Sequence, residues 1–129
     1  MAAHAESSHP AARTLLLGIA TSPEQAAQAL AEGADLVDAS AASPASLAAI
    51  RASQPGGVLW AGSPAGPLDI DLLVADATQA KVAALAAIST WLGAPVIRTR
   101  HTRAVRRAID MTASIAGRRP PALTIRGLA

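Results

Sequence analysis

The sequence contains no cysteine, no phenylalanine and no tyrosine, and its aromatic side chains are two tryptophans. The lack of cysteine excludes disulfides, thiolate metal ligands and cysteine nucleophiles, and it fits a reducing cytoplasm. With so few aromatic rings, the chain lacks the stacking surfaces that hold unpaired bases, which speaks against a nucleic-acid partner. No run of about 18 apolar residues occurs, so we expect no membrane span.

The chain has 129 residues, enough for one domain with a buried core. Residues 1–13 lack the apolar stretch of a signal peptide, and we expect them to form a disordered arm. We assign residues 14–117 to a single α/β domain and residues 118–129 to a C-terminal tail. Together with the absence of cysteine, this organisation predicts a cytoplasmic protein.

Short apolar runs alternate with segments of helical spacing along the chain. Such alternation predicts right-handed crossovers and a parallel sheet. A full eight-stranded barrel needs roughly 250 residues, so we expect an α/β fold with about five parallel strands, as an open sheet or a partial (β/α) barrel. The expected strands are 14–20, 35–39, 58–61, 70–75 and 95–99.

Four helices are expected between and after these strands. Ser22 followed by Pro23, and Ser43 followed by Pro44, predict two helix starts, because serine caps a helix and proline suits its first turn. Thr102 is the expected cap of the last helix. The clearest amphipathic helix spans 81–92, with a shared apolar face formed by Val82, Leu85, Ile88 and Leu92.

Basic residues are concentrated near the end of the chain. Eight of the eleven Lys and Arg side chains follow residue 97, whereas Asp110 is the one acidic residue there. Such a cluster can meet an anion, a nucleic acid or an acidic protein, or it can simply form a solvated surface.

Two segments carry a family likeness. Residues 28–38 read QALAEGADLVD, and residues 87–111 read AISTWLGAPVIRTRHTRAVRRAIDM. The first resembles the passage AEGADLIDVGGES of dihydropteroate synthases. The second is similar to the end of the same family, where a helix ending in W-x-G-A leads to a strand with R-x-H-D-V and a final helix. Residues 119–129 also resemble the ending of actinobacterial members.

Dihydropteroate synthases displace pyrophosphate from a pterin with p-aminobenzoate, and the Arg and His of their R-x-H motif hold the phosphates. Here the first loop, residues 18–23, lacks the asparagine that helps to bind Mg²⁺, and Asp38 is followed by A-S-A rather than G-G-E-S-T-R-P. The pterin-binding stretch D-P-G-x-G-F-x-K has no counterpart, and residues 76–78 replace S-R-K. The resemblance therefore implies a shortened, degenerate member with an anion-binding remnant and no metal cofactor.

Arg98 and Arg100 are the candidate anion-binding residues. Arg98 matches the family arginine and Arg100 occupies the family's histidine position, with His101 displaced by one residue. Alternate residues of a strand share one face, so both guanidinium groups can meet phosphate or pyrophosphate at the carboxyl end of the strand. The alternative is that they pair with Asp38 or Asp76 at the rim of the sheet.

Asp38, Asp76 and His101 are the candidate pterin or rim contacts. The two aspartates end predicted strands, where they can hold a cation together, cap loops or meet arginines. His101 is either a proton donor or a loop residue. No spacing matches a metal site or a serine nucleophile with its base, so no catalytic or metal-binding residue is assigned.

We therefore expect a dihydropteroate synthase-like protein, non-catalytic alone and linked to folate biosynthesis, that binds phosphate, pyrophosphate or a pterin. One alternative is an active transferase completed by a partner chain, and another is an arginine-rich module that docks on an acidic protein. The family's last two helices form its dimer interface. The resemblance thus implies a homodimer, or a heterodimer with a full-length relative, through 81–92 and the apolar Val105, Ile109 and Ile115.

Overall fold

The structure, a computed structural model, describes residues 13–54, 59–60, 67–74, 76 and 78–118. The predicted N-terminal arm, apart from Arg13, and all but the first residue of the predicted tail lie outside the described residues. The strands are β1 (Leu15–Ile19), β2 (Leu36–Asp38), β3 (Leu59–Trp60), β4 (Leu68–Asp69) and β5 (Val96–Thr99). The helices are α1 (Pro23–Ala31), α2 (Pro44–Ser53), α3 (Ile70–Leu73), α4 (Gln79–Trp91) and α5 (Thr102–Ile115).

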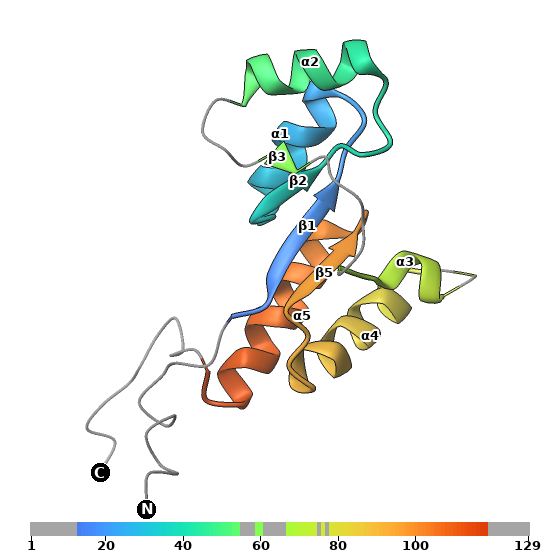
Figure 1. Ribbon diagram of the computed structural model, residues 1–129. Helices are drawn as coiled ribbons and strands as arrows, with labels where there is room; N and C mark the ends of the chain where they lie inside the picture. The colour runs from blue at the N-terminus through green and yellow to red at the C-terminus, as the bar shows by residue number, and fades with distance from the viewer. Residues whose placement is uncertain (1–12, 55–58, 61–66, 75, 77, 119–129) are drawn as a thin grey trace, which may run out of the picture.

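The strands form one sheet in the order β3-β2-β1-β5-β4, with parallel pairing at every junction (Figure 1). β3 and β4 have only two residues each and lie at the two edges. The sheet is therefore open between β3 and β4, and the predicted class, a parallel α/β sheet with alternating helices, is confirmed. Among the described residues, no helix has the length and apolar character needed to cross a membrane.

The four longer helices lie on one face of the sheet. Leu16 and Ile97, paired across β1 and β5, pack against α4 and α5 in one core cluster. Val37 of β2 packs against α1 and α2 in a second cluster. Because side chains alternate along a strand, Leu17, Asp38 and Arg98 point to the opposite face. The longer helices thus cover one face of the sheet, and α1 and α5 lie behind its strands in Figure 1.

The first two helix starts are as predicted. Ser22 and Ser43 each accept a hydrogen bond from the amide three residues later, at 3.2 and 3.1 Å. The third differs, because α5 begins at Thr102 itself, and His101 occupies the cap position without a side-chain hydrogen bond.

The predicted strand 70–75 is wrong. The strand there is Leu68–Asp69, and residues 70–73 form α3. The Asp69 side chain accepts a hydrogen bond from the amide of Leu72 at 3.1 Å, and this cap turns the chain into a helix as soon as the strand ends.

The predicted apolar face of α4 is also wrong in part. Val82 is buried and Leu85 packs against the core, but Ile88 and Leu92 are exposed. The buried side continues instead through Ala86 and Ser89. Small residues thus form much of the side of α4 that packs against α5, and the larger Ile88 and Leu92 face outward.

Val105 and Ile109 belong to the same core cluster and are therefore not available to a partner chain. The prediction that these two residues contact a partner chain in a dimer is therefore wrong. Ile115, the third, is exposed.

Gly18 sets the distance between β1 and α1. A Cβ atom at this position would lie 2.7 Å from the Ala29 Cβ and 3.2 Å from the Ala34 Cβ. We expect Gly18→Ala to lower the free energy of unfolding by about 1–3 kcal/mol, because neither neighbour is a flexible side chain that can move aside. Urea denaturation measures this change.

Gly93→Asn is the matched control for this prediction. Gly93 follows α4 with φ of +86°, and its added Cβ would meet nothing within 4 Å. Asparagine tolerates this conformation, so the control should cost less than about 1 kcal/mol. A Gly18→Ala variant as stable as the wild type would show that α1 is not held this close.

Candidate functional site at the carboxyl edge of the sheet

Arg98 links three strands on the face of the sheet opposite the four longer helices. Its Nε donates to Oδ2 of Asp38 at the end of β2, and its Nη1 donates to Oδ2 of Asp69 at the end of β4. The Asp38 side chain is fully buried, and those of Arg98 and Asp69 are each 14% exposed. The other Asp38 oxygen, Oδ1, accepts the Ser40 amide at 2.9 Å.

The electrostatics of this cluster favour a permanently charged arginine. Burial alone would lower the pKa of Arg98, but hydrogen bonds and charge attraction, from Asp38 first and then Asp69, raise it above the ordinary value of an arginine. A raised pKa of a cation stabilises the fold while the group is protonated. The charge of Arg98 therefore contributes stability up to a higher pH than that of an ordinary arginine.

Asp71 shapes the loop that follows β5. Its carboxylate accepts hydrogen bonds from the Thr99 hydroxyl at 2.7 Å and from the Arg100 amide at 2.6 Å. The Thr99 hydroxyl in turn accepts the His101 amide at 2.9 Å. Asp71 of α3 thus fixes the backbone of the loop at Arg100, and Thr99 fixes it at His101.

The predicted site residues are only partly brought together. Arg98 is engaged by Asp38, one of the two pairings left open from the sequence. Arg100 instead projects outward, with its side chain 69% exposed and its Nη1 4.0 Å from Asp71 Oδ2. His101 is half-buried at the start of α5, and Asp76 is exposed. The predicted anion contact through Arg98 and Arg100 together therefore rests on Arg100 alone, unless Arg98 leaves its carboxylates.

Two adjoining cavities lie where α1 faces the start of α5, with volumes of about 460 and 310 Å³. Gln28, Glu32, Arg100 and Thr102 line both of them. Arg103 lines the smaller one, and its Nη2 lies 3.8 Å from Glu32 Oε1. The cavities thus present two exposed arginines and one carboxylate next to the first amides of α5.

Sequence analysis missed Asp69, Asp71 and Arg103 as members of this edge. Asp69 and Asp71 fell in or beside the segment interpreted as a strand. Their recognisable signal was the D-I-D-L-L pattern, in which an aspartate precedes a short helix and another lies in its first turn. Arg103 was counted only as one of many arginines.

No protein-family model, curated protein or solved structure matches this chain. The class of protein is defined here by its fold and site. The protein has an open parallel α/β sheet with its longer helices on one face and with several arginines at its carboxyl edge.

Proposed function

We propose that the chain is a non-catalytic, cytoplasmic protein of the dihydropteroate synthase type that binds a phosphate-bearing ligand at the carboxyl edge of its sheet. Arg100 and Arg103 are the proposed anion contacts. The strand order is the observation that best supports the barrel-type part of this proposal, because it relates the first strand directly to the last.

In the sheet, every strand pairs with its neighbour in sequence except β3 and β4, and β1 pairs with β5. This is the order of a ring that has been opened at one place. A (β/α) barrel pairs its first and last strands, and it keeps its helices on the outer face. We therefore propose that the sheet is a partial barrel, in which Asp38, Asp69 and Arg98 occupy the inner face.

The start of α5 supports the proposed anion site. The first amides of a helix have no acceptor within the helix, and they favour a negative charge. In this helix the cap position supplies no side-chain acceptor. Arg100 and Arg103 lie on either side of that start with exposed side chains, so both can turn toward the same anion. Glu32 opposes binding, which favours a doubly charged ligand such as phosphate or pyrophosphate.

The carboxylates at this edge support a binding role rather than catalysis. Asp38 and Asp69 are held by Arg98, and Asp71 is held by the loop after β5. A Mg²⁺ ion needs carboxylate oxygens directed at it. Both Asp38 oxygens already have partners, so these residues do not fit a magnesium site, and no step of a reaction is assigned to the chain.

Calorimetric titration with pyrophosphate at low salt tests the proposed site. Arg100→Gln and Arg103→Gln should each weaken binding by about tenfold, because each removes one charge-assisted contact. Arg51→Gln, an exposed arginine on α2, is the matched control and should leave the affinity unchanged.

Equal pyrophosphate affinities in all three variants would exclude this anion site. A separate assay with the pterin pyrophosphate and p-aminobenzoate tests the absence of catalysis. Formation of dihydropteroate by the purified chain would contradict a non-catalytic role. Formation only after addition of a partner chain would favour the transferase alternative.

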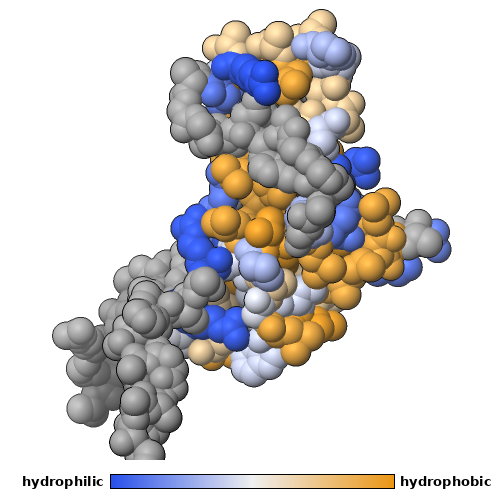
Figure 2. All heavy atoms as spheres, in the orientation of Figure 1, coloured by the Kyte–Doolittle hydropathy of each residue, from blue (hydrophilic) through white to orange (hydrophobic). Residues whose placement is uncertain are grey.

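The outer surface of the helices supports self-association. Five large apolar side chains there are exposed: Ile88, Trp91, Leu92, Met111 and Ile115. Ile88, Trp91, Leu92 and Ile115 line one shallow apolar hollow between α4 and α5. Figure 2 shows apolar surface gathered over α3 and α4. We propose that a second copy of the chain, or a full-length relative, covers this hollow.

A further inference from the structure

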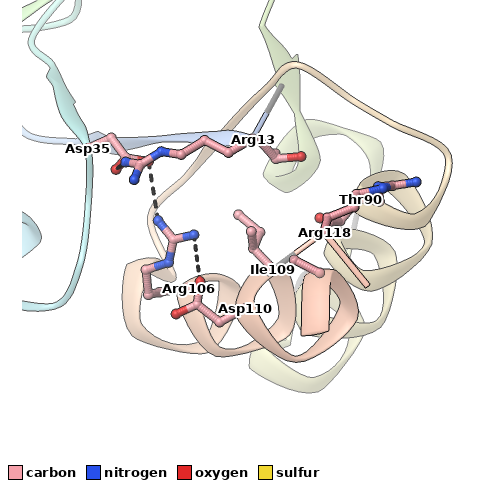
Figure 3. A pocket seen from close by; sticks show the side chains of 9 residues that line it. Arg13, Asp35, Thr90, Arg106, Ile109, Asp110 and Arg118 are labelled. Atoms are coloured by element: carbon pink, nitrogen blue, oxygen red, sulfur yellow. Dashed lines mark hydrogen bonds and ion pairs between the residues drawn. The ribbon is translucent and has the colours of Figure 1, made fainter. Parts of the chain in front are cut away.

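The two adjoining cavities at the carboxyl edge differ from a third cavity, which lies at the opposite, amino edge of the sheet. This amino-edge cavity has a volume of about 390 Å³ and is lined by charged side chains (Figure 3). Arg106 pairs there with Asp35 at 3.2 Å and with Asp110 at 2.9 Å. Arg118 donates to two backbone carbonyls of α4. The charges of the amino-edge cavity are thus engaged by the protein's own groups, whereas those of the carboxyl edge are not.

A buried hydroxyl group lies at the base of the carboxyl-edge cavities. Thr102 lines both of them and is 2% exposed. Its Oγ1 lies where β1 meets α5, 3.2 Å from the position that a Cβ atom on Gly18 would take. Within the described part of the chain this hydroxyl has no hydrogen-bond partner, and it is not closed off from solvent. A ligand in these cavities would therefore meet a group that can both donate and accept.

The side of α1 that lines the larger cavity adds further donors and acceptors. Gln25 Oε1 accepts hydrogen bonds from the amide and the hydroxyl of Thr21, at 2.8 and 3.0 Å, and no described group accepts from Gln25 Nε2. Gln28 Nε2 donates to Glu32 Oε1 at 3.0 Å, and no described group donates to Gln28 Oε1. All four residues line this cavity. Its wall thus has one amide donor and one amide acceptor available, each held in place by a neighbour.

This mixture of donors and acceptors fits hydroxyl groups better than other ligand groups. A hydroxyl donates one hydrogen bond and accepts others, so it can pair with an amide nitrogen, an amide oxygen or a threonine. A bare phosphate dianion offers mainly acceptors, and it is repelled by the carboxylate of Glu32. A flat aromatic body gains most from stacking, but the lining of the two cavities contains no aromatic side chain among the described residues.

The geometry points to a phosphate monoester of a small polyhydroxylated compound, a polyol or sugar phosphate, as the ligand of this edge. The phosphate group lies at the start of α5, against Arg100 and Arg103. The hydroxyl groups lie against Gln25, Gln28 and Thr102 in the larger cavity. Such an ester carries close to two negative charges at pH 7, which suits a site that also holds a carboxylate. This inference rests on the proposed function, because it takes the same anion site and names the class of compound that fills it.

Three esters with the same phosphate group test the inference on the full chain, by calorimetry at low salt. Propyl phosphate and glycerol 3-phosphate have the same carbon chain, but only the second has free hydroxyl groups. Phenyl phosphate carries an aromatic ring instead. Glycerol 3-phosphate should bind about tenfold more tightly than either of the others, because its hydroxyl groups pair with groups that the other two esters leave without partners.

Two variants assign the contacts of the hydroxyl groups. Thr102→Val removes the hydroxyl and keeps the shape of the side chain, and Gln28→Met removes the amide. Each should weaken the binding of glycerol 3-phosphate by about fivefold and that of propyl phosphate by less than about twofold. Thr90→Val is the matched control, because this threonine is also buried, its hydroxyl is closed off from solvent, and it lies near the far end of α4. It should leave the affinities for all three esters unchanged.

Equal affinities of the wild type for glycerol 3-phosphate and propyl phosphate would overturn the inference and leave the anion site in place. Tighter binding of phenyl phosphate than of glycerol 3-phosphate, or binding of pyrophosphate without any of the esters, would overturn it as well. If neither pyrophosphate nor any ester binds, the proposed anion site itself is wrong. The wild-type series separates these results even if a variant fails to fold.

Discussion

Replacing Arg98 with methionine should lower the free energy of unfolding by about 3–5 kcal/mol. The change leaves Asp38 and Asp69 close together, on the face of the sheet opposite the four longer helices, without their shared cation, and the Asp38 side chain is fully buried. Two uncompensated carboxylates in such a place repel each other and have lost their hydration. Chemical denaturation at pH 7 measures the loss.

Arg100→Met is the matched control. Its side chain is 69% exposed and 4.0 Å from Asp71, so the change should cost no more than about 1 kcal/mol. An Arg98→Met variant as stable as this control would mean that the ion cluster does not hold the strands together.

Two isoleucines of α5 should respond in opposite ways to the same substitution. Ile109→Glu should abolish folding, because the side chain is 2% exposed within the core and a buried charge without a partner costs more than about 4 kcal/mol. Ile115→Glu should leave the fold intact, because this side chain is 70% exposed. If the proposed dimer forms through α4 and α5, Ile115→Glu should also convert it to a monomer.

Circular dichroism and light scattering at micromolar concentration separate these effects. A wild-type protein that is monomeric under these conditions would contradict the proposed self-association, whatever the variants do. A well-folded Ile109→Glu variant would contradict the core described here. Ile88→Glu, on the facing helix, should reproduce the effect of Ile115→Glu.

Local signals in the sequence were sufficient for much of the fold. Ser22 and Ser43 form caps with their own neighbouring amides, so these helix starts depend on three or four residues and can be predicted from them. The alternation of strands and helices likewise predicts a parallel sheet without knowledge of distant contacts.

Other features depend on contacts that the sequence does not display. An apolar run such as 70–75 suits a strand or a helix, and the Asp69 cap decides between them. In α4, five of the thirteen residues are alanines, and packing against α5 selects which stripe is buried. Large exposed residues such as Ile88 then mislead a prediction based on periodicity.

The candidate site was predicted least well for the same reason. Arg98 and Asp69 are 29 residues apart, and their meeting depends on β4 lying next to β5. A pairing of the arginines with Asp38 was one of the predicted alternatives, because Asp38 was expected at the end of a strand. Which of several arginines remains available to an anion is decided by the strand order, and no local pattern encodes that order.

The pairing of β1 with β5 has a consequence for how the chain is made. The cluster around Val37 uses residues 20–50, and it can form while the rest of the protein is still being synthesised. The cluster around Leu16 instead needs α4, β5 and α5, and the Thr14 hydroxyl meets the Ala94 carbonyl 80 positions later. During synthesis, the edge of β1 that pairs with β5 therefore stays without its hydrogen-bond partners until β5 has been made. Contacts this distant in sequence slow folding, and neither junction of β5, with β1 or with β4, can form before β5 has been made.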